Sequence, residues 1–112
     1  MKITKEMEDK INEHISSINE WFTDNHPDDE SITITMSDTH RMLISSDGKT
    51  ICYGKVSTIP NWVNIVFLPT ATKLKILENW TYIKQAYIAE KKRIANQNQK
   101  TIDLINNFTL GG

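Results

Sequence analysis

The fold is decided between residues 31 and 68, which read SITITMSDTHRMLISSDGKTICYGKVSTIPNWVNIVFL. Near the centre of this stretch, Asp47-Gly48 predicts a two-residue hairpin turn, because such turns need positive φ angles that Gly adopts freely and Asp tolerates. We therefore expect strands at 41–46 and 49–55 to pair antiparallel. Residues 31–36 alternate apolar and polar side chains, the pattern of a half-buried strand. Residues 61–68 are apolar on both faces, which predicts a strand covered on both sides or lying in the middle of the sheet.

Helical patterns flank these strands. Residues 4–25 place their apolar side chains along one side of a helix, with Thr4 as the N-cap and a stop before Pro27. Residues 72–108 predict a long C-terminal helix whose N-cap is Thr70 or Thr72. The sequence therefore predicts a single α+β domain over residues 1–112, with an N-terminal helix, a four-stranded antiparallel β-meander and a long C-terminal helix packed on the sheet.

The C-terminal helix has two further features. Its apolar stripe returns at Ile105 and Phe108 if the helix continues unbroken, but the polar run between them and the first part predicts fraying or a break near residues 96–100. A weaker apolar strip on another face predicts either an extra edge of the core or a second interface, with a homodimer as one possibility. The residues of that possible second interface are Leu74, Leu77 and Ile88.

Composition limits the class of protein. At 112 residues, with 38% hydrophobic and 24% charged residues, the chain suits one globular core. A single cysteine, Cys52, excludes an intramolecular disulfide and a zinc site made of several thiolates, and it points to a reducing compartment. The N-terminus is charged throughout, and no apolar run approaches the length of a membrane span. We expect a cytoplasmic protein that does not enter a membrane.

Charge is distributed unevenly along the chain. Residues 1–30 hold three lysines against nine acidic residues, whereas the remainder holds ten Lys and Arg against five acidic residues. Five of the carboxylates fall within about a sixth of the first helix's circumference, opposite its apolar side, with no cation apparent among them. This pattern predicts an acidic surface for a basic protein partner, and we call it the acidic ridge. Its residues are Glu6, Asp9, Glu13, Glu20 and Asp24, extended in the following loop by Asp28, Asp29 and Glu30.

Motifs for chemistry are scarce. His14, His26 and His40 have no second ligand at metal-binding spacing, and the chain contains no glycine-rich phosphate loop, so we expect neither a metal nor another cofactor. The one compact acid–base cluster, residues 38–41, lies on a predicted turn and resembles a solvated loop more than an active site centred on His40. Basic residues scatter around the C-terminal helix and the pI is about 6.3, which argues against direct nucleic-acid binding.

These observations predict a non-enzymatic binding protein. The function that we expect is that of a small stoichiometric inhibitor or adaptor, of the phage anti-defence or toxin-immunity kind, whose acidic ridge engages a basic partner such as a nuclease. The alternative is a homo-oligomeric structural or scaffold protein assembled through its helices, in which the acidic first helix of one chain meets the basic last helix of another.

Overall fold

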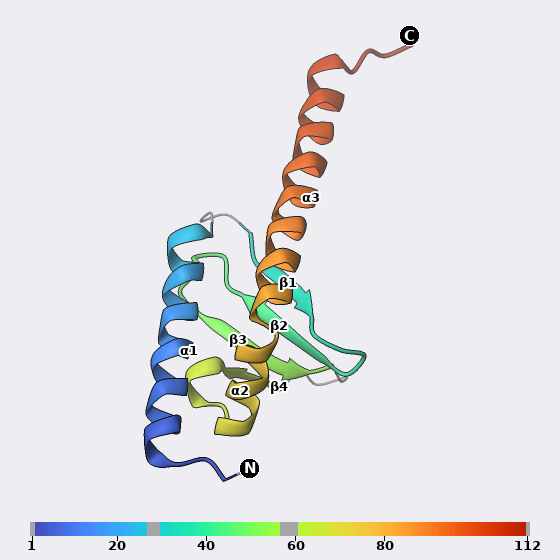
Figure 1. Cartoon of the computed structure of the whole chain (residues 1–112). Coiled ribbons are helices and arrows are strands. Elements are labelled where there is room, and N and C mark those ends of the chain that lie inside the picture. Colours follow the sequence, from blue (N-terminus) through green and yellow to red (C-terminus); the bar gives the residue numbers. More distant parts are fainter. Residues whose placement is uncertain (1, 27–29, 57–60, 112) are drawn as a thin grey trace.

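The computed structural model describes residues 2–26, 30–56 and 61–111. A first helix, α1, is followed by a sheet with the strand order β1-β2-β3-β4 and then by a helical C-terminal part (Figure 1). All neighbouring strands in this sheet are antiparallel. The predicted α+β class, with an N-terminal helix, a β-meander and a long C-terminal helix packed on the sheet, is confirmed.

Helix α1 spans Lys5–Asn25 and begins at the predicted cap. The Thr4 Oγ1 atom accepts a hydrogen bond of 3.2 Å from the backbone N–H of Met7, which satisfies one of the amide groups left unpaired at a helix start. The apolar side of the helix is buried, as the periodicity predicts, through Ile11, Ile15, Ile18 and Phe22. His26 ends the helix in an extended conformation.

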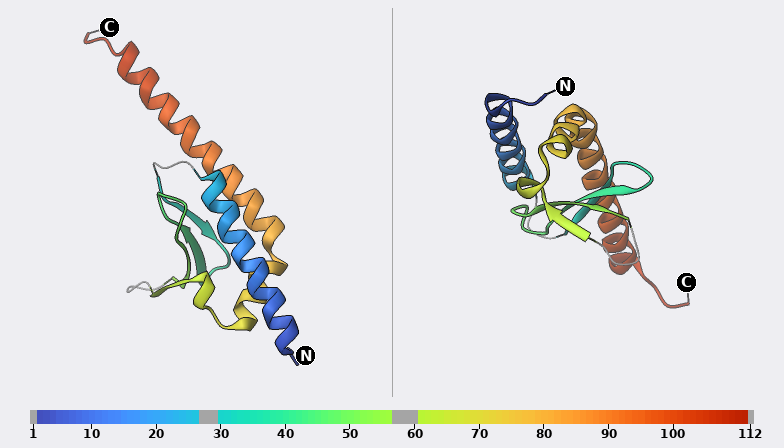
Figure 2. Two further views of the ribbon diagram at one scale, coloured as in Figure 1. Left: turned by 90° about the vertical axis from the view of Figure 1, so that its left-hand side faces the viewer. Right: turned by 90° about the horizontal axis from the view of Figure 1, so that it is seen from below.

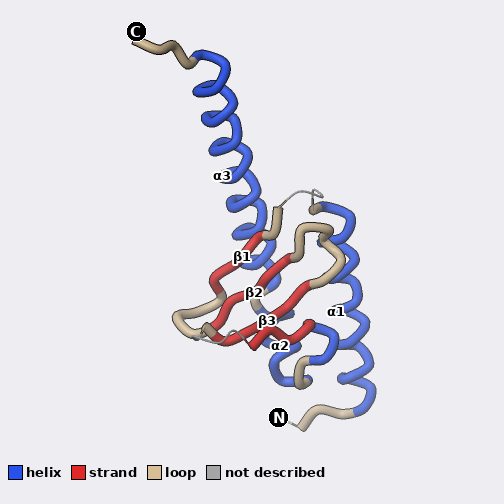
Figure 3. The backbone as a smooth tube through the Cα atoms, turned by 180° about the vertical axis from the view of Figure 1, so that it is seen from behind, coloured by secondary structure: helices blue, strands red, loops and turns tan. Residues whose placement is uncertain are grey.

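The strands are shorter than predicted but lie in the predicted places. They are β1 (Ile32–Thr35), β2 (His40–Ile44), β3 (Ile51–Lys55) and β4 (Asn61–Asn64). The alternation predicted for the first strand is confirmed, since Ile32 and Ile34 are buried and the threonines between and after them are exposed. Ile32, Ile44 and Ile51 lie directly opposite one another across three strands. One face of the sheet is therefore apolar and faces the helices, while the other is open (Figure 3).

The turn between β2 and β3 differs from the predicted two-residue hairpin. The last ladder bond runs from Ser45 N–H to the Thr50 carbonyl, and Gly48 N–H closes a turn onto the Ser45 carbonyl at 2.9 Å. Within this turn Gly48 has a positive φ, +71°, whereas Asp47 keeps an ordinary backbone conformation. The Asp47 carboxylate instead accepts hydrogen bonds from Ser45 Oγ and Lys49 N–H, and this side-chain bonding widens the loop.

The prediction for residues 61–68 is wrong in its second half and in the position of the strand, which is neither covered on both sides nor in the middle of the sheet. β4 is an edge strand that ends at Asn64, where the chain turns into a 3₁₀ helix, η1 (Ile65–Phe67). The Asn64 side chain accepts a hydrogen bond from Val66 N–H at 3.1 Å, so a local cap competes with the strand. The apolar residues of this run therefore have different surroundings. Ile65 is buried in the core, whereas Phe67 is 79% exposed on the surface.

The C-terminal helical part breaks at a different place from the one predicted. It consists of α2 (Thr70–Glu78), which begins one residue after Pro69 without a side-chain cap, and α3 (Trp80–Asn107). The break lies at Asn79, whose side-chain amide donates to the Lys75 carbonyl at 2.8 Å. Such bonding by Asn competes with regular helix geometry. The polar run at 96–100, where a break was predicted, is continuous helix because its side chains lie in water and need no core partner.

The second half of α3 leaves the rest of the molecule. Every described residue from Ala95 onward is exposed, and Figure 2 shows this part of the helix standing clear of the sheet and of α1. We call residues 95–110 the arm and the described structure before residue 95 the body; the helical part of the arm, 95–107, is about 20 Å long at 1.5 Å per residue. The molecule measures 69 × 31 × 20 Å with a radius of gyration of 17.6 Å. A compact chain of this length has a radius of about 13 Å, so the arm accounts for the extended shape.

Candidate functional site

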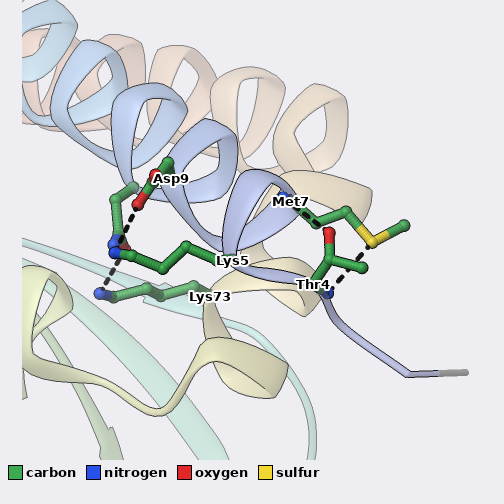
Figure 4. A network of polar contacts seen from close by, with 6 residues as sticks. Thr4, Lys5, Met7, Asp9 and Lys73 are labelled. Atoms are coloured by element: carbon green, nitrogen blue, oxygen red, sulfur yellow. Dashed lines mark hydrogen bonds and ion pairs between the residues drawn. The ribbon is translucent and has the colours of Figure 1, made fainter.

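The acidic ridge on α1 is solvent-exposed but only partly unpaired. Glu6, Glu20 and Asp24 are exposed and have no Lys or Arg within ion-pair distance among the described residues. Asp9 lies 3.2 Å from Lys5 Nζ, and Glu13 lies 3.6 Å from Lys10 Nζ (Figure 4 shows the first of these pairs). The ridge therefore contains two cations from its own helix, which corrects the expectation of an uninterrupted row of like charges.

Of the three loop residues expected to extend the acidic ridge, only Glu30 is among the described residues. Asp28 and Asp29 lie outside the described residues. Glu30 is not on the outer face of α1: it lines a pocket beside α3, together with Lys91. The coherent acidic surface is thus the face of α1 alone.

The basic residues of the C-terminal part are not a free surface that complements the ridge. Lys73 is buried between α1 and α2, where its Nζ donates to Asn12 Oδ1 at 2.7 Å. Lys91 Nζ donates to the Asn25 carbonyl at 2.8 Å, at the negative end of the α1 dipole. Lys84 Nζ lies 5.5 Å from the centre of the Trp21 ring, a cation–π contact. Several lysines thus hold α1, α2 and α3 together within one chain.

The possible second interface does not form one strip. Leu74 and Leu77 lie on α2, half-buried against the core, whereas Ile88 lies on α3 and is 52% exposed. The break at Asn79 separates the two helices, so the periodicity that joined these residues in the sequence does not continue in space. Leu74 and Leu77 pack against the core.

The arm carries the largest concentration of exposed apolar side chains among the described residues. Its face continues the stripe that is buried in the first half of α3, where Ile83 and Tyr87 are 0% and 1% exposed. The exposed residues are Ile102 at 48%, Leu104 at 65%, Ile105 at 68%, Phe108 at 67% and Leu110 at 94%. An isolated helix of this length is marginal in water, and exposed apolar surface of this kind is typical of interaction sites.

A pocket opens where the arm leaves the body. Its volume is about 140 Å³, and it is lined by His26, Ile32, Lys91, Ile94, Ala95 and Asn98, among others. We call it the base pocket. Its floor is fixed by buried hydrogen bonds: His26 Nδ1 lies 2.9 Å from the Tyr87 hydroxyl, and His26 Nε2 lies 2.6 Å from the Glu30 carbonyl. The end of α1, the start of β1 and α3 are thereby joined around one histidine.

From the sequence alone His26 is considered only as a metal ligand, and so its structural role is missed. The sequence around His26 gives only local information: the residue directly precedes a proline and a polar loop. The sequence does not show that His26 lies close to Tyr87 in space, because Tyr87 is 61 residues later along the chain. Only the packing of α3 beside the end of α1 brings the two rings together.

The acid–base cluster at residues 38–41 does not converge on one point. His40 stacks on Tyr53 at 5.3 Å between ring centres, and its Nδ1 lies 2.8 Å from Thr39 Oγ1. Arg41 alternates with His40 along β2 and therefore points to the opposite face of the sheet. His40 does line a polar pocket of about 420 Å³ with Lys75 and Asn79, but no carboxylate lines that pocket.

Other chemical groups offer little more. Burial raises the pKa of the Cys52 thiol, which disfavours the reactive thiolate. Among the described residues, no cluster of three His, Cys, Asp or Glu side chains could hold a metal ion. In the same part of the chain, none of the helices is both long enough and apolar enough to span a membrane.

No protein-family model, curated protein or solved structure matches this chain.

Proposed function

We propose that this chain is a non-enzymatic binding protein in which the α+β body presents a helical arm that pairs with another helix. The observation that carries the proposal is the continuation of α3 past the body with Ile102, Ile105 and Phe108 exposed on one face. These residues recur at intervals of three, one of the two spacings of a helix that packs against a second helix.

The magnitude of the apolar surface supports pairing of moderate strength. Full burial of an Ile or Phe side chain contributes about 1.5–3 kcal/mol, so the three residues on this face would contribute roughly 4.5–9 kcal/mol. Association costs about 4–15 kcal/mol in lost freedom of motion. The two ranges overlap, which favours a reversible contact over a permanent one.

The proposal is tested by comparing what the full chain and an arm variant retain from the lysate of the native host. The variant Ile105→Asp/Phe108→Asp places two charges on the apolar face, whereas Asn96→Asp places one on the opposite side of the same helix. We expect proteins retained by the wild type and by Asn96→Asp to be lost from the double variant. Identical sets of retained proteins in all three samples would contradict the proposal.

The acidic ridge supports a second candidate, a stoichiometric inhibitor or adaptor of the phage anti-defence or toxin-immunity kind that captures a basic partner such as a nuclease. The specific observation in its favour is that Glu6, Glu20 and Asp24 are exposed and unpaired among the described residues. Exposed charges are screened within about 8–10 Å at physiological salt, so capture by the ridge must weaken as salt rises.

The ridge is tested by Glu20→Lys/Asp24→Lys, with Lys5→Glu/Lys10→Glu as the control that makes the same surface more acidic. We expect capture of a basic partner to be lost in the first variant and to be retained or strengthened in the second. Equal capture by both variants would eliminate the ridge as a binding surface.

A further inference from the structure

We infer that the helix paired with the arm is the arm of a second copy of this chain, aligned antiparallel, with Phe108 of each copy seated in the base pocket of the other. This inference rests on the proposed function and identifies its partner. Four observations carry it: the charge of the stripe, its symmetry, the position of the body and the size of the base pocket.

The stripe is uncharged, so it complements itself better than it complements a charged surface. Between Ile94 and Phe108 the only charged residues are Lys100 and Asp103, and at 100° per residue both fall on the half of the helix opposite Ile105. A basic groove or an acidic helix would find no opposite charge on this face. A second copy brings no like charge to it.

The order of residues along the stripe is suited to a two-fold antiparallel pair. Ile94, Asn98, Thr101, Ile105 and Phe108 are separated by alternating intervals of four and three residues, the spacing of a helix–helix seam. When two arms pair antiparallel with Thr101 of one opposite Thr101 of the other, their apolar ends meet. Ile94 then lies opposite Phe108 of the second copy. Such self-complementarity is what a closed two-fold interface requires.

The body excludes the parallel alternative. The stripe lies on the same side of α3 as Ile83 and Tyr87, which are buried against the body. A helix laid along the arm in the parallel sense would continue into the volume that the body of the first copy already fills. An antiparallel arm instead ends at the body, because it begins at the far tip and stops opposite Ile94.

The base pocket lies where that arm would end. Ile32, Ile94 and Ala95 form the apolar part of its lining. The pocket is open to solvent, and its volume of about 140 Å³ is comparable with that of an enclosed cavity of about 150 Å³ that holds a benzene molecule. Phe108, 67% exposed at the end of α3, supplies a phenyl ring at this level. Lys91 and Glu30 also line the pocket, and Lys91 Nζ donates to the Asn25 carbonyl of its own chain.

The first test is the mass of the full chain in solution, measured by light scattering across the micromolar range. Two four-turn helices give an interface near or below about 1,200 Å², the low end for specific complexes, so we expect a dimer with a micromolar dissociation constant. Phe108→Asp should raise that constant about 100-fold, whereas Asn96→Asp should leave it unchanged. A wild-type chain that is monomeric throughout this range, or a dimer that survives Phe108→Asp, would overturn the inference.

The second test measures direction by disulfide cross-linking in a Cys52→Ser background. We expect Thr101→Cys to form cross-linked dimers on mild oxidation. A mixture of Asn98→Cys and Ile105→Cys chains should form heterodimers, and Asn98→Cys alone should form almost none. Efficient linking of Asn98→Cys alone, or no linking of Thr101→Cys, contradicts antiparallel pairing.

Failure of this inference and failure of the proposed function give different results. If the wild type is monomeric but still retains another protein in a manner that Ile105→Asp/Phe108→Asp abolishes, the arm binds a different helix and only the identity of the partner is wrong. If the double variant changes neither mass nor retention, the arm is not a binding surface.

Discussion

The two halves of α3 have the same apolar pattern but opposite surroundings. Ile83 and Tyr87 are completely buried, whereas Ile105 and Phe108, on the same side of the same helix, are more than two-thirds exposed. The pattern specifies a helix with one face that avoids water, but it does not specify what covers that face. In the first half the cover comes from α1 and the sheet, and in the second half the body supplies none.

The largest expected difference between the halves is in amide hydrogen exchange. In the Phe108→Asp chain, amides near Tyr87 should open only when the body unfolds, which for domains of this kind slows exchange by about three or more orders of magnitude. Amides of the arm should exchange almost as fast as in an unfolded peptide, because a helix of this length is marginal alone. Equal protection of both halves would contradict the division of α3 into body and arm.

Matched truncations of isoleucine sharpen the comparison. Ile83→Ala removes buried methyl groups from the core and should lower the free energy of unfolding by about 2–5 kcal/mol. Ile105→Ala removes the same groups from an exposed site and should change it by no more than about 0.5 kcal/mol at a concentration where the chain is monomeric. Urea unfolding monitored by tryptophan fluorescence measures both, since Trp21 and Trp80 pack at the core.

Gly48, in the body, and Gly111, beyond the arm, allow a similar comparison. Gly48 has a φ of +71°, and a Cβ there would lie 2.9 Å from His26 Cβ and 3.1 Å from the Phe22 carbonyl. Gly48→Ala should therefore cost about 1–3 kcal/mol of stability, with the thermal midpoint falling accordingly. Gly111, beyond the arm, has a φ of +81° but nothing within 4 Å, so Gly111→Ala should leave the midpoint unchanged. A large effect at Gly111 would mean that the tip is packed in solution.

The elements of the body could be predicted from the sequence because each is encoded locally. The alternation of residues 31–36, the cap at Thr4 and the stripe of α1 depend on neighbours within a few positions. The errors arise where a side chain bonds to the backbone and overrides the pattern. Asn64 ends β4 early and Asn79 breaks the C-terminal helix, although nothing in the periodicity distinguishes these asparagines from those at 96 and 98, which remain helical.

The candidate sites could be predicted less well because they depend on distances between elements. The exposed face of α1 was predictable, but its ion pairs with Lys5 and Lys10 required attention to cations at the i±3 and i±4 positions. The base pocket could not be predicted, since His26 and Tyr87 meet only through packing. The arm is exposed because the body covers only the first half of α3. The helical periodicity does not predict where that cover ends.

The smallest expected difference between body and arm is in the response to acid. Hydrogen bonds from Ser45 Oγ and Lys49 N–H lower the pKa of the Asp47 carboxyl below its ordinary value of 3.8. When pH falls through that value, the unfolded chain binds a proton before the folded chain does, so stability declines until the lower pKa of the folded state is passed. Asp47→Asn should flatten the dependence of the urea midpoint on pH below about pH 5. Asp103→Asn, in the arm, should leave that dependence as in the wild type, because the arm does not take part in the cooperative unfolding of the body. If Asp103→Asn flattened the curve instead, the arm would be coupled to the stability of the body, and the two halves of α3 would be one folding unit.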